Sequence, residues 1–190
     1  MDADRLLELL LEAAMLKRVP RSGWALRGVP HVESVAEHSF GVALVALALA
    51  DGLNAGAELE SPLDVEEVLT MAVLHDLAEV RLTDLPASAA RLIPASVKSQ
   101  AERAALAGLL APLPGAGRLL RLWQAFEDSS GAEACLVRDA DKLEMMLQCL
   151  CYEQAGSQGL GEFWQAMDEH EWHYALSAEL YRRLRGMRVA

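Results

Sequence analysis

The sequence has 190 residues, of which 53% are hydrophobic and 24% charged, and it contains 13 Gly and 7 Pro. This composition predicts a single domain over residues 1–190 and excludes a disordered, collagen-like or linker-dominated chain. The formal net charge of −11 excludes a sequence-independent interaction with a nucleic acid polymer, because that interaction depends on Lys and Arg side chains that neutralise phosphates.

The sequence also argues against a membrane segment and against export. The longest uninterrupted apolar run, residues 40–50, is much shorter than the roughly 20 residues that a membrane-spanning helix needs. The amino terminus carries acidic residues where a secretory signal carries positive charge. The cysteines Cys135, Cys149 and Cys151 form no C-x-x-C pair and are expected in one helix as buried thiols. We therefore expect a cytoplasmic protein.

The first predicted helix covers residues 4–17. It places Leu and Ala on one face and ends with Lys17 and Arg18, so cations lie at the negative end of the helix dipole. Two prolines and two glycines then interrupt regular structure over residues 19–34. This segment is expected to be a loop that carries Arg21, Trp24 and His31.

The second predicted helix runs from about Val35 to Leu53 and is apolar on nearly all sides, so it should lie at the centre of the fold. A third helix starts with Asp64 and Glu67, in the manner of a capping box, and its apolar residues recur at helical spacing to about Val80. After a Pro-containing segment, helices are expected at 96–111, 115–128, 131–155 and 162–186. No stretch alternates with period 2, so the fold class is all-α, a single helical bundle.

Ionisable side chains cluster at the end of the third predicted helix. Its apolar stripe extends to Asp76, with His75 beside it and Glu79 one turn further. A buried carboxylate needs a cation, a hydrogen-bond network or a metal ion. Because imidazole and carboxylate together suit a divalent first-row metal, the cluster is a candidate metal site. A hydrogen-bonded His-Asp pair at a helix end is the structural alternative.

Two other segments supply candidate ligands. His38 opens the most apolar helix, where a structural role is the ordinary alternative for a single histidine. Asp139 and Asp141 begin an otherwise apolar helix, and one of them could simply favour the helix amino terminus. Helical geometry leaves the choice between the two aspartates open, with a slight preference for Asp139, which lies nearer the Leu face.

Several segments resemble, in order and spacing, the HD-domain metal-dependent phosphohydrolases, and within them the 5'-deoxynucleotidase branch. They are Glu33-x-Val35-x-Glu37-His38-Ser39, His75-Asp76-x-x-Glu79, Thr83-Asp84-Leu85-Pro86 and Ala140-Asp141-Lys142-Leu143. The stretch from Leu16 to Trp24 also looks like this branch. The resemblance covers roughly residues 5–155, and the region after Gly156 carries no recognisable motif.

The resemblance implies a single metal ion held by His38, His75, Asp76 and Asp141. The ion is a divalent transition metal, and Mn, Co, Fe, Ni and Zn all suit such ligands. The family pattern therefore selects Asp141 as the ligand. Asp139 is left as a residue that supports a ligand or caps a helix.

The resemblance also implies roles around a bound nucleotide. Glu79 resembles the family's acid/base residue, and Asp84 resembles a contact to the sugar 3'-hydroxyl, with turn formation as its alternative. Trp24 would pack on the deoxyribose and leave no room for a 2'-hydroxyl, or would simply cover the core. A phosphate dianion also needs cations, for which Arg21 is the first candidate and Lys17 and Arg18 are the next.

These features predict a hydrolase that releases phosphate from deoxyribonucleoside 5'-monophosphates. The alternatives are another HD phosphohydrolase, acting on a cyclic nucleotide, a nucleoside triphosphate or another small phosphate ester, and a helical regulatory protein without turnover. An apolar surplus in and near the last helices also predicts a homodimer. The residues concerned are Met145, Met146, Phe163, Trp164 and Trp172.

Overall fold

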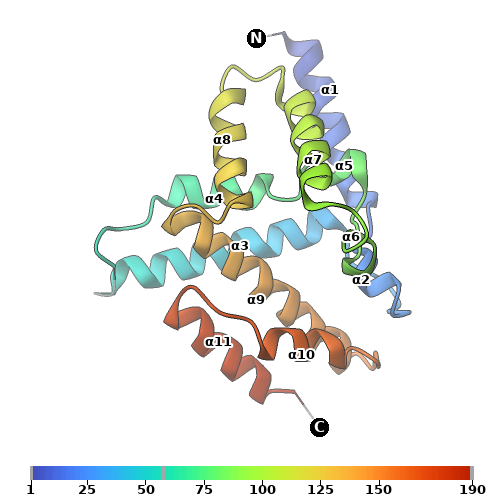
Figure 1. Cartoon of the computed structure of the whole chain (residues 1–190), viewed down its shortest axis with the longest axis vertical. Coiled ribbons are helices and arrows are strands. Elements are labelled where there is room, and N and C mark those ends of the chain that lie inside the picture. The colour runs from blue at the N-terminus through green and yellow to red at the C-terminus, as the bar shows by residue number, and fades with distance from the viewer. Residues whose placement is uncertain (1, 57–58, 189–190) are drawn as a thin grey trace.

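The computed structural model describes residues 2–56 and 59–188 (Figure 1). Within these residues the only β pairing is an isolated antiparallel bridge between Pro20 and Ser34, and the predicted all-α fold class is confirmed. The helices are α1 (Ala3–Ala13), the 3-10 helix η1 (Ala14–Arg18), α2 (Ser22–Ala25), α3 (Val35–Ala55), α4 (Val65–Leu74), α5 (Glu79–Leu82), α6 (Ala87–Ala90), α7 (Ala95–Leu110), α8 (Ala116–Glu127), α9 (Ala132–Gln154), α10 (Gly161–Asp168) and α11 (Ala175–Gly186).

Two long helices, α3 and α9, pack against each other at the centre of the bundle (Figure 1). α4 contacts both of them, α8 lies against α4 and α9, and α7 packs on α8. α10 and α11 contact α9 from the side away from α8. The first helix, α1, and the last helix, α11, therefore lie at opposite ends of the molecule, since α1 extends from the other side (Figure 1). The predicted central position of residues 35–53 is therefore confirmed.

A capping box fixes the start of α3. Ser34 Oγ accepts a hydrogen bond from Glu37 N (3.2 Å), and the Glu37 carboxylate accepts one from Ser34 N (2.6 Å). Among the described helices, α3 alone is long and apolar enough to cross a membrane by length and composition. Its contacts with α4 and α9 are instead those of a central bundle helix.

The third predicted helix is correct at its start and wrong at its end. Asp64 caps α4 by accepting hydrogen bonds from Glu66 N and Glu67 N, as expected. The helix stops at Leu74, however, and i→i−3 hydrogen bonds lead into the short helix α5 and continue through its first three residues. These bonds are donated by the amides of Leu77, Glu79, Val80 and Arg81. Regular helical spacing therefore does not relate Asp76 to Glu79.

Residues 19–34 are more ordered than the loop that their Pro and Gly content predicts. Trp24 lies in the one-turn helix α2. Arg21 N donates a hydrogen bond to Glu33 O (3.0 Å), which forms part of the bridge that closes the segment on itself. Arg21 is thereby held beside the first turn of α3.

The predicted C-terminal helix is split into α10 and α11 by the connection over residues 169–174. Asp139, fully buried on α9, binds the end of this connection. Its carboxylate accepts hydrogen bonds from His173 N (3.2 Å), His173 Nδ1 (2.8 Å) and Tyr174 N (3.1 Å). Asp139 therefore anchors the connection that leads into α11, through hydrogen bonds to residues that precede that helix. Its own helix begins at Ala132, so the expected role of Asp139 at a helix amino terminus is wrong. The other predicted helices agree with α7, α8 and α9, and the first is divided between α1 and η1.

Two apolar clusters meet at the turn between α4 and α5. The main cluster includes Met71 and Ala72, while a smaller cluster contains Leu74 and Ala78 together with residues of α7 and α8. The turn over residues 75–78 lies at their junction. The fold thereby places the polar side chains of His75 and Asp76 beside both apolar clusters.

Candidate metal centre and substrate pocket

His38 lies in the first turn of α3 and is fully buried. Its Nδ1 is 2.5 Å from Glu144 Oε2, and its Nε2 is 3.2 Å from Asp141 Oδ1, both on α9. Burial lowers the pKa of His38, but the hydrogen bonds to Asp141 and Glu144 outweigh burial and raise the pKa to about 10. The surroundings of this ring therefore favour a positive charge.

His75 ends α4 and is held at two points. Its Nδ1 donates a hydrogen bond to Ala72 O (2.8 Å), and Trp123 Nε1 donates one to the His75 carbonyl (3.3 Å). Because Nδ1 is a donor, the neutral ring carries its lone pair on Nε2. That lone pair is directed at the neighbouring polar side chains.

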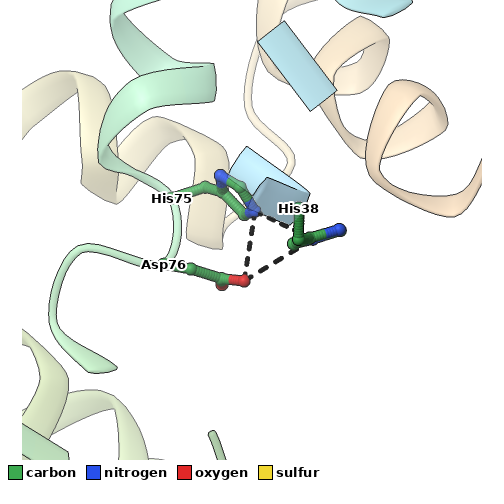
Figure 2. A group of neighbouring side chains, drawn as sticks. All are labelled: His38, His75 and Asp76. Atoms are coloured by element: carbon green, nitrogen blue, oxygen red, sulfur yellow. Dashed lines mark hydrogen bonds and ion pairs between the residues drawn. The ribbon is translucent and has the colours of Figure 1, made fainter. Parts of the chain in front are cut away.

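Figure 2 shows how His38, His75 and Asp76 converge. The two Nε2 atoms are 3.4 Å apart, and Asp76 Oδ2 lies 3.2 Å from His75 Nε2 and 3.7 Å from His38 Nε2. Asp141 joins this group from α9 through its contact with His38. The structure thus brings together the four residues that the resemblance implies as metal ligands.

The four side chains fit a divalent transition metal. The Nε2 atoms of His38 and His75 face each other at a separation at which two lone pairs repel unless a proton or cation lies between them. Burial raises the pKa of Asp76 and Asp141, but the contacts of Asp76 with His75 and Arg21, and those of Asp141 with Lys142 and His38, outweigh burial. They lower the pKa of both carboxyls and hold them ionised. Imidazole nitrogen with carboxylate oxygen is a donor set that these metals accept.

Two buried glutamates lie on the other side of the His38 ring. Glu144 accepts from its Nδ1, and Glu33 accepts a hydrogen bond from Trp24 Nε1 (2.8 Å). Burial and the charge of Glu144 raise the pKa of Glu33 to about 7. Glu33, His38 and Glu144 could also hold a metal ion by proximity, but the facing atoms of this group already serve these hydrogen bonds.

Arg21 connects the cluster to the loop after α5. Its Nη1 lies 3.3 Å from Asp76 Oδ2 and 3.5 Å from Asp84 Oδ1. Asp84 Oδ2 in turn accepts hydrogen bonds from Ser22 N (2.6 Å) and Ser22 Oγ (3.1 Å). Burial lowers the pKa of Arg21, but Asp76 and Asp84 outweigh burial and raise it further. The guanidinium is a fixed positive charge.

A cavity of about 310 Å³ opens beside the cluster. Its charged wall consists of the acids Asp76, Asp84 and Asp141 and the cations Arg21, Lys98 and Lys142. Its apolar wall includes Trp24, Leu85, Met145 and Phe163. Lys17 and Arg18, the other predicted phosphate ligands, are exposed on η1 and lie outside this wall. The lysines that line the cavity are instead Lys98 and Lys142.

Trp24 covers the core, as one of its two alternatives had it, and it also lines the cavity. Only 2% of the residue is exposed, and its indole Nε1 is engaged by Glu33. Its ring centroid lies 4.3 Å from that of Phe163 and 5.5 Å from that of Tyr152. Trp24 is thus a core residue that presents only carbon atoms to the cavity.

Glu79 lies at the start of α5, on a neighbouring cavity of about 270 Å³ that shares Leu85 and Lys98 with the first one. Its Oε2 is buried and has no hydrogen-bond partner among the described residues. Burial, followed by the charges of Asp76 and Asp84, raises the pKa of Glu79 to about 9. At neutral pH the carboxyl group therefore carries a proton.

Sequence reasoning missed four side chains of this region: Glu144, Lys98, Lys142 and Phe163. Lys142 stands in a family-like segment, but the sequence predicts no role for it. A signal existed for Glu144, because it lies three residues after Asp141 and so on the same helix face. Lys98 on α7 and Phe163 on α10 follow no motif in the sequence. Only the packing of their helices against the rest of the bundle brings them to the cavity.

Comparison with known proteins places these features in a family. A family model described as HD domain matches residues 13–171. A human protein named 5'-deoxynucleotidase HDDC2 is 35% identical over 153 residues, which cover 80% of this chain and 70% of the human protein. A Dictyostelium discoideum protein of the same name is 33% identical over 150 residues, covering 78% of this chain and 77% of the relative.

Solved structures show the same similarity over nearly the whole chain. The crystal structure of a Pyrococcus horikoshii OT3 protein superimposes with a TM-score of 0.77 at 40% identity, covering 95% of this chain and 96% of the other. A protein from Pyrococcus furiosus gives the same TM-score at 37% identity, with 95% and 97% covered. From the family model and these relatives, we conclude that the chain belongs to the HD domain family.

Proposed function

We propose that this protein is a metal-dependent 5'-deoxynucleotidase, which hydrolyses deoxyribonucleoside 5'-monophosphates to a deoxynucleoside and phosphate. One observation carries the proposal: His38, His75, Asp76 and Asp141 converge beside a cavity into which Arg21 also projects. The substrate class comes from the relatives named 5'-deoxynucleotidase in humans, Dictyostelium and other eukaryotes.

The four converging residues are the proposed ligands of one divalent transition metal, namely Mn, Co, Fe, Ni or Zn. Bound there, such an ion supplies Lewis acidity towards a phosphoryl oxygen and a water. The protein's part is to hold the two imidazoles by their Nδ1 atoms, through Glu144 and Ala72, so that both Nε2 atoms face the same point.

The phosphate group is proposed to bind at Arg21. Two ligand carboxylates cancel the charge of a divalent ion, so a phosphate dianion needs further positive charge. Only Nη1 of Arg21 is engaged by Asp76 and Asp84, which leaves other N–H groups of the planar guanidinium for phosphate oxygens. Lys98 and Lys142 line the same cavity and add to its positive charge.

Glu79 is the proposed general acid. The group that leaves the phosphorus is the 5'-oxygen of the deoxynucleoside, and it must gain a proton. The raised pKa of Glu79, about 9, keeps a proton on the side chain at neutral pH, and its Oε2 has no competing acceptor among the described residues. These properties suit proton donation to the leaving oxygen.

Asp84 and Trp24 are proposed to recognise the sugar of the substrate. Asp84 lines the cavity with a carboxylate that Ser22 holds in place, and it is the proposed acceptor for the 3'-hydroxyl. Trp24 has no free N–H, because Glu33 engages it, so a 2'-hydroxyl against this ring would lack a hydrogen-bond partner. This loss supports selectivity for the 2'-deoxy sugar.

The test is a phosphate-release screen over matched deoxyribo- and ribonucleoside 5'-monophosphates, on chelator-treated protein with and without added Mn or Co. Release from the deoxy substrates only in the presence of metal supports the proposal, and equal rates on both sugars contradict it. Release only from cyclic nucleotides, triphosphates or other esters would point to a different HD phosphohydrolase. No release from any of them would point to a regulatory protein.

We further propose that the protein is a cytoplasmic homodimer built from one-domain chains that bind no membrane. The apolar surplus expected to form the dimer is largely internal, since Met146 and Trp164 are fully buried. The outer face of α3 is instead exposed and apolar at helical spacing, with Phe40 73%, Leu44 57% and Leu47 41% exposed. The three cysteines lie on α9 as expected, but only Cys149 is buried, while Cys135 is half-buried and Cys151 is exposed. Free thiols of this kind suit a reducing compartment.

Sedimentation of the wild type and of Leu44→Glu tests the dimer. We expect the wild type to sediment as a dimer and the variant as a monomer. Leu92→Glu is the matched control, because Leu92 is 86% exposed and lies outside α3. A monomeric wild type would refute the proposal, and a dimeric Leu44→Glu variant would refute the role of α3.

A further inference from the structure

A carboxylate beneath the proposed metal site reaches His38 from the side opposite to the cluster. Glu144 is buried on α9, with 8% of its surface exposed, and its Oε2 lies 2.5 Å from His38 Nδ1. The opposite ring nitrogen, Nε2, is the atom directed at His75, Asp76 and Asp141. Glu144 therefore contacts the one edge of the imidazole that the cluster does not use.

Gly41 makes room for this contact. It lies three residues after His38 in α3, on the same side of the helix. A Cβ atom at position 41 would lie 2.5 Å from Glu144 Oε1, 2.8 Å from its Cγ and 3.0 Å from its Cδ. No side chain other than that of glycine leaves the carboxylate where it is. An interior helical glycine is unfavourable by itself, so its presence here has a steric explanation.

The chemistry of the contact acts on the proposed metal ligand. A carboxylate that accepts from Nδ1–H fixes the tautomer with the lone pair on Nε2, sets the ring plane and makes the nitrogen more basic. Ala72 O does the same for His75, but a neutral carbonyl is a weaker acceptor than a carboxylate. The two proposed histidine ligands are therefore supported unequally, with the charged partner on His38.

We infer that Glu144 is a positioning residue that holds the His38 ring for the metal. Gly41 leaves the space that the Glu144 carboxylate occupies. This inference rests on the proposed metal site. It assigns to position 41 a steric requirement for glycine, which helix propensity opposes.

The experiment measures metal affinity of the chelator-treated protein by calorimetric titration with Mn and by the absorption spectrum of bound Co. Glu144→Ala is expected to weaken the metal Kd by about 10- to 100-fold, the usual result of removing such a partner. Glu144→Gln keeps an acceptor oxygen and is expected to lose less than about 10-fold. Tm and circular dichroism of the metal-free variants establish that they fold.

Gly41→Ala is expected to weaken the metal Kd by about 10-fold or more, because the new methyl group displaces the Glu144 carboxylate. In the Glu144→Ala background, the same change should have no further effect, since nothing remains to be displaced. Gly52→Ala is the matched control. It adds the same methyl group to α3, where it meets Leu176 Cδ2 at 3.4 Å, and should leave the metal Kd unchanged.

A wild-type metal Kd in folded Glu144→Ala would overturn the inference while leaving the proposed metal site intact. Additive losses in the double variant would show that Gly41 acts independently of Glu144, which also contradicts it. A wild type that binds neither Mn nor Co would refute the proposed metal site, and this inference with it.

Discussion

On one face of α9, Asp141 meets His38 within the proposed metal site, while on another face Asp139 holds the connection between α10 and α11. The two aspartates are only two residues apart. Helical residues at this spacing are about 200° apart around the axis, so one helix can serve both sides of the bundle. The contrast shows that similar buried acids in one short segment can belong to chemistry and to architecture.

The two faces also differ in what compensates the buried charge. Asp139 is satisfied by neutral backbone N–H groups and by the His173 ring, with no surface left exposed. Asp141 has His38 and Lys142 as partners and lines the cavity. Removing the Asp139 carboxylate should therefore lower the stability of the fold, and removing the Asp141 carboxylate should impair the proposed metal site.

The largest expected effect is on metal content. Asp141→Ala should abolish metal binding and activity, because it removes a charged donor, whereas Asp139→Ala should keep close to one metal per chain. Elemental analysis after desalting measures both. A reversed result would mean that the roles of the two faces of α9 are exchanged.

Turnover should respond most strongly to Glu79. Glu79→Gln preserves size but cannot donate a carboxylic proton, so kcat should fall by roughly 100-fold or more with metal content unchanged. The measurement is steady-state phosphate release beside elemental analysis. Near-normal kcat in this variant would show that Glu79 is a structural residue. The charged groups around Asp141 would then have to supply the chemistry of the site.

The same substitution should raise stability in the metal-free protein. The pKa of Glu79 is about 9 in the fold against an ordinary value of 4.5, so above pH 4.5 the unfolded chain ionises a group that the folded chain keeps protonated. Wild-type stability is thereby lost as pH rises between these values. The Tm of Glu79→Gln should exceed that of the wild type at neutral pH and match it near pH 4.5. A constant Tm difference across this range would contradict the raised pKa.

Asp139→Ala should lower stability rather than activity. It leaves the amides of His173 and Tyr174 without their acceptor, at a cost of about 3 kcal/mol and hence about 6–12 °C in Tm. Calorimetry of the metal-free protein measures the loss. A Tm equal to that of the wild type would mean that the connection between α10 and α11 does not depend on this residue.

The smallest expected effect concerns Phe163, which α10 brings to the cavity and which lies outside the family-like segments of the sequence. If its ring contacts the nucleobase, Phe163→Ala should raise KM for deoxynucleoside monophosphates by about 2- to 10-fold. KM for deoxyribose 5-phosphate, which has no base, should not change. Phe163→Tyr is the control that keeps an aromatic ring. Equal changes in KM for both substrates in Phe163→Ala would contradict a contact between Phe163 and the nucleobase.

The sequence was sufficient for much of the fold and for the proposed ligands. Apolar periodicity predicted the long helices α3, α7, α8 and α9, and the family-like segments selected the four residues that converge. Periodicity failed where a tertiary contact redirects the backbone. Nothing local in residues 162–186 reveals that a carboxylate on α9 binds the amides of His173 and Tyr174. The turn at His75 likewise lies where Ala72 packs into one apolar cluster and Leu74 into the other.

The pocket walls were the least predictable part. Lys17 and Arg18 lie close to Arg21 in sequence but end on the exposed side of η1, while Lys98 and Phe163 arrive from helices without motifs. Charge type and sequence proximity cannot identify such residues, because their positions depend on how α7 and α10 cross the rest of the bundle.

The bridge between Pro20 and Ser34 limits how far nearby substitutions can displace Arg21. Its hydrogen bonds join Arg21 N to Glu33 O and Val35 N to Val19 O, so they involve backbone atoms alone. Side-chain changes at Ala25 and Leu26, in the exposed tip over residues 25–28, should therefore leave Arg21 anchored beside α3, whereas Arg27 pairs with Glu162 and Gly28 has a φ of +71°. The tip offers a site where an inserted tag or fluorophore would report on the neighbouring pocket without dislodging its arginine.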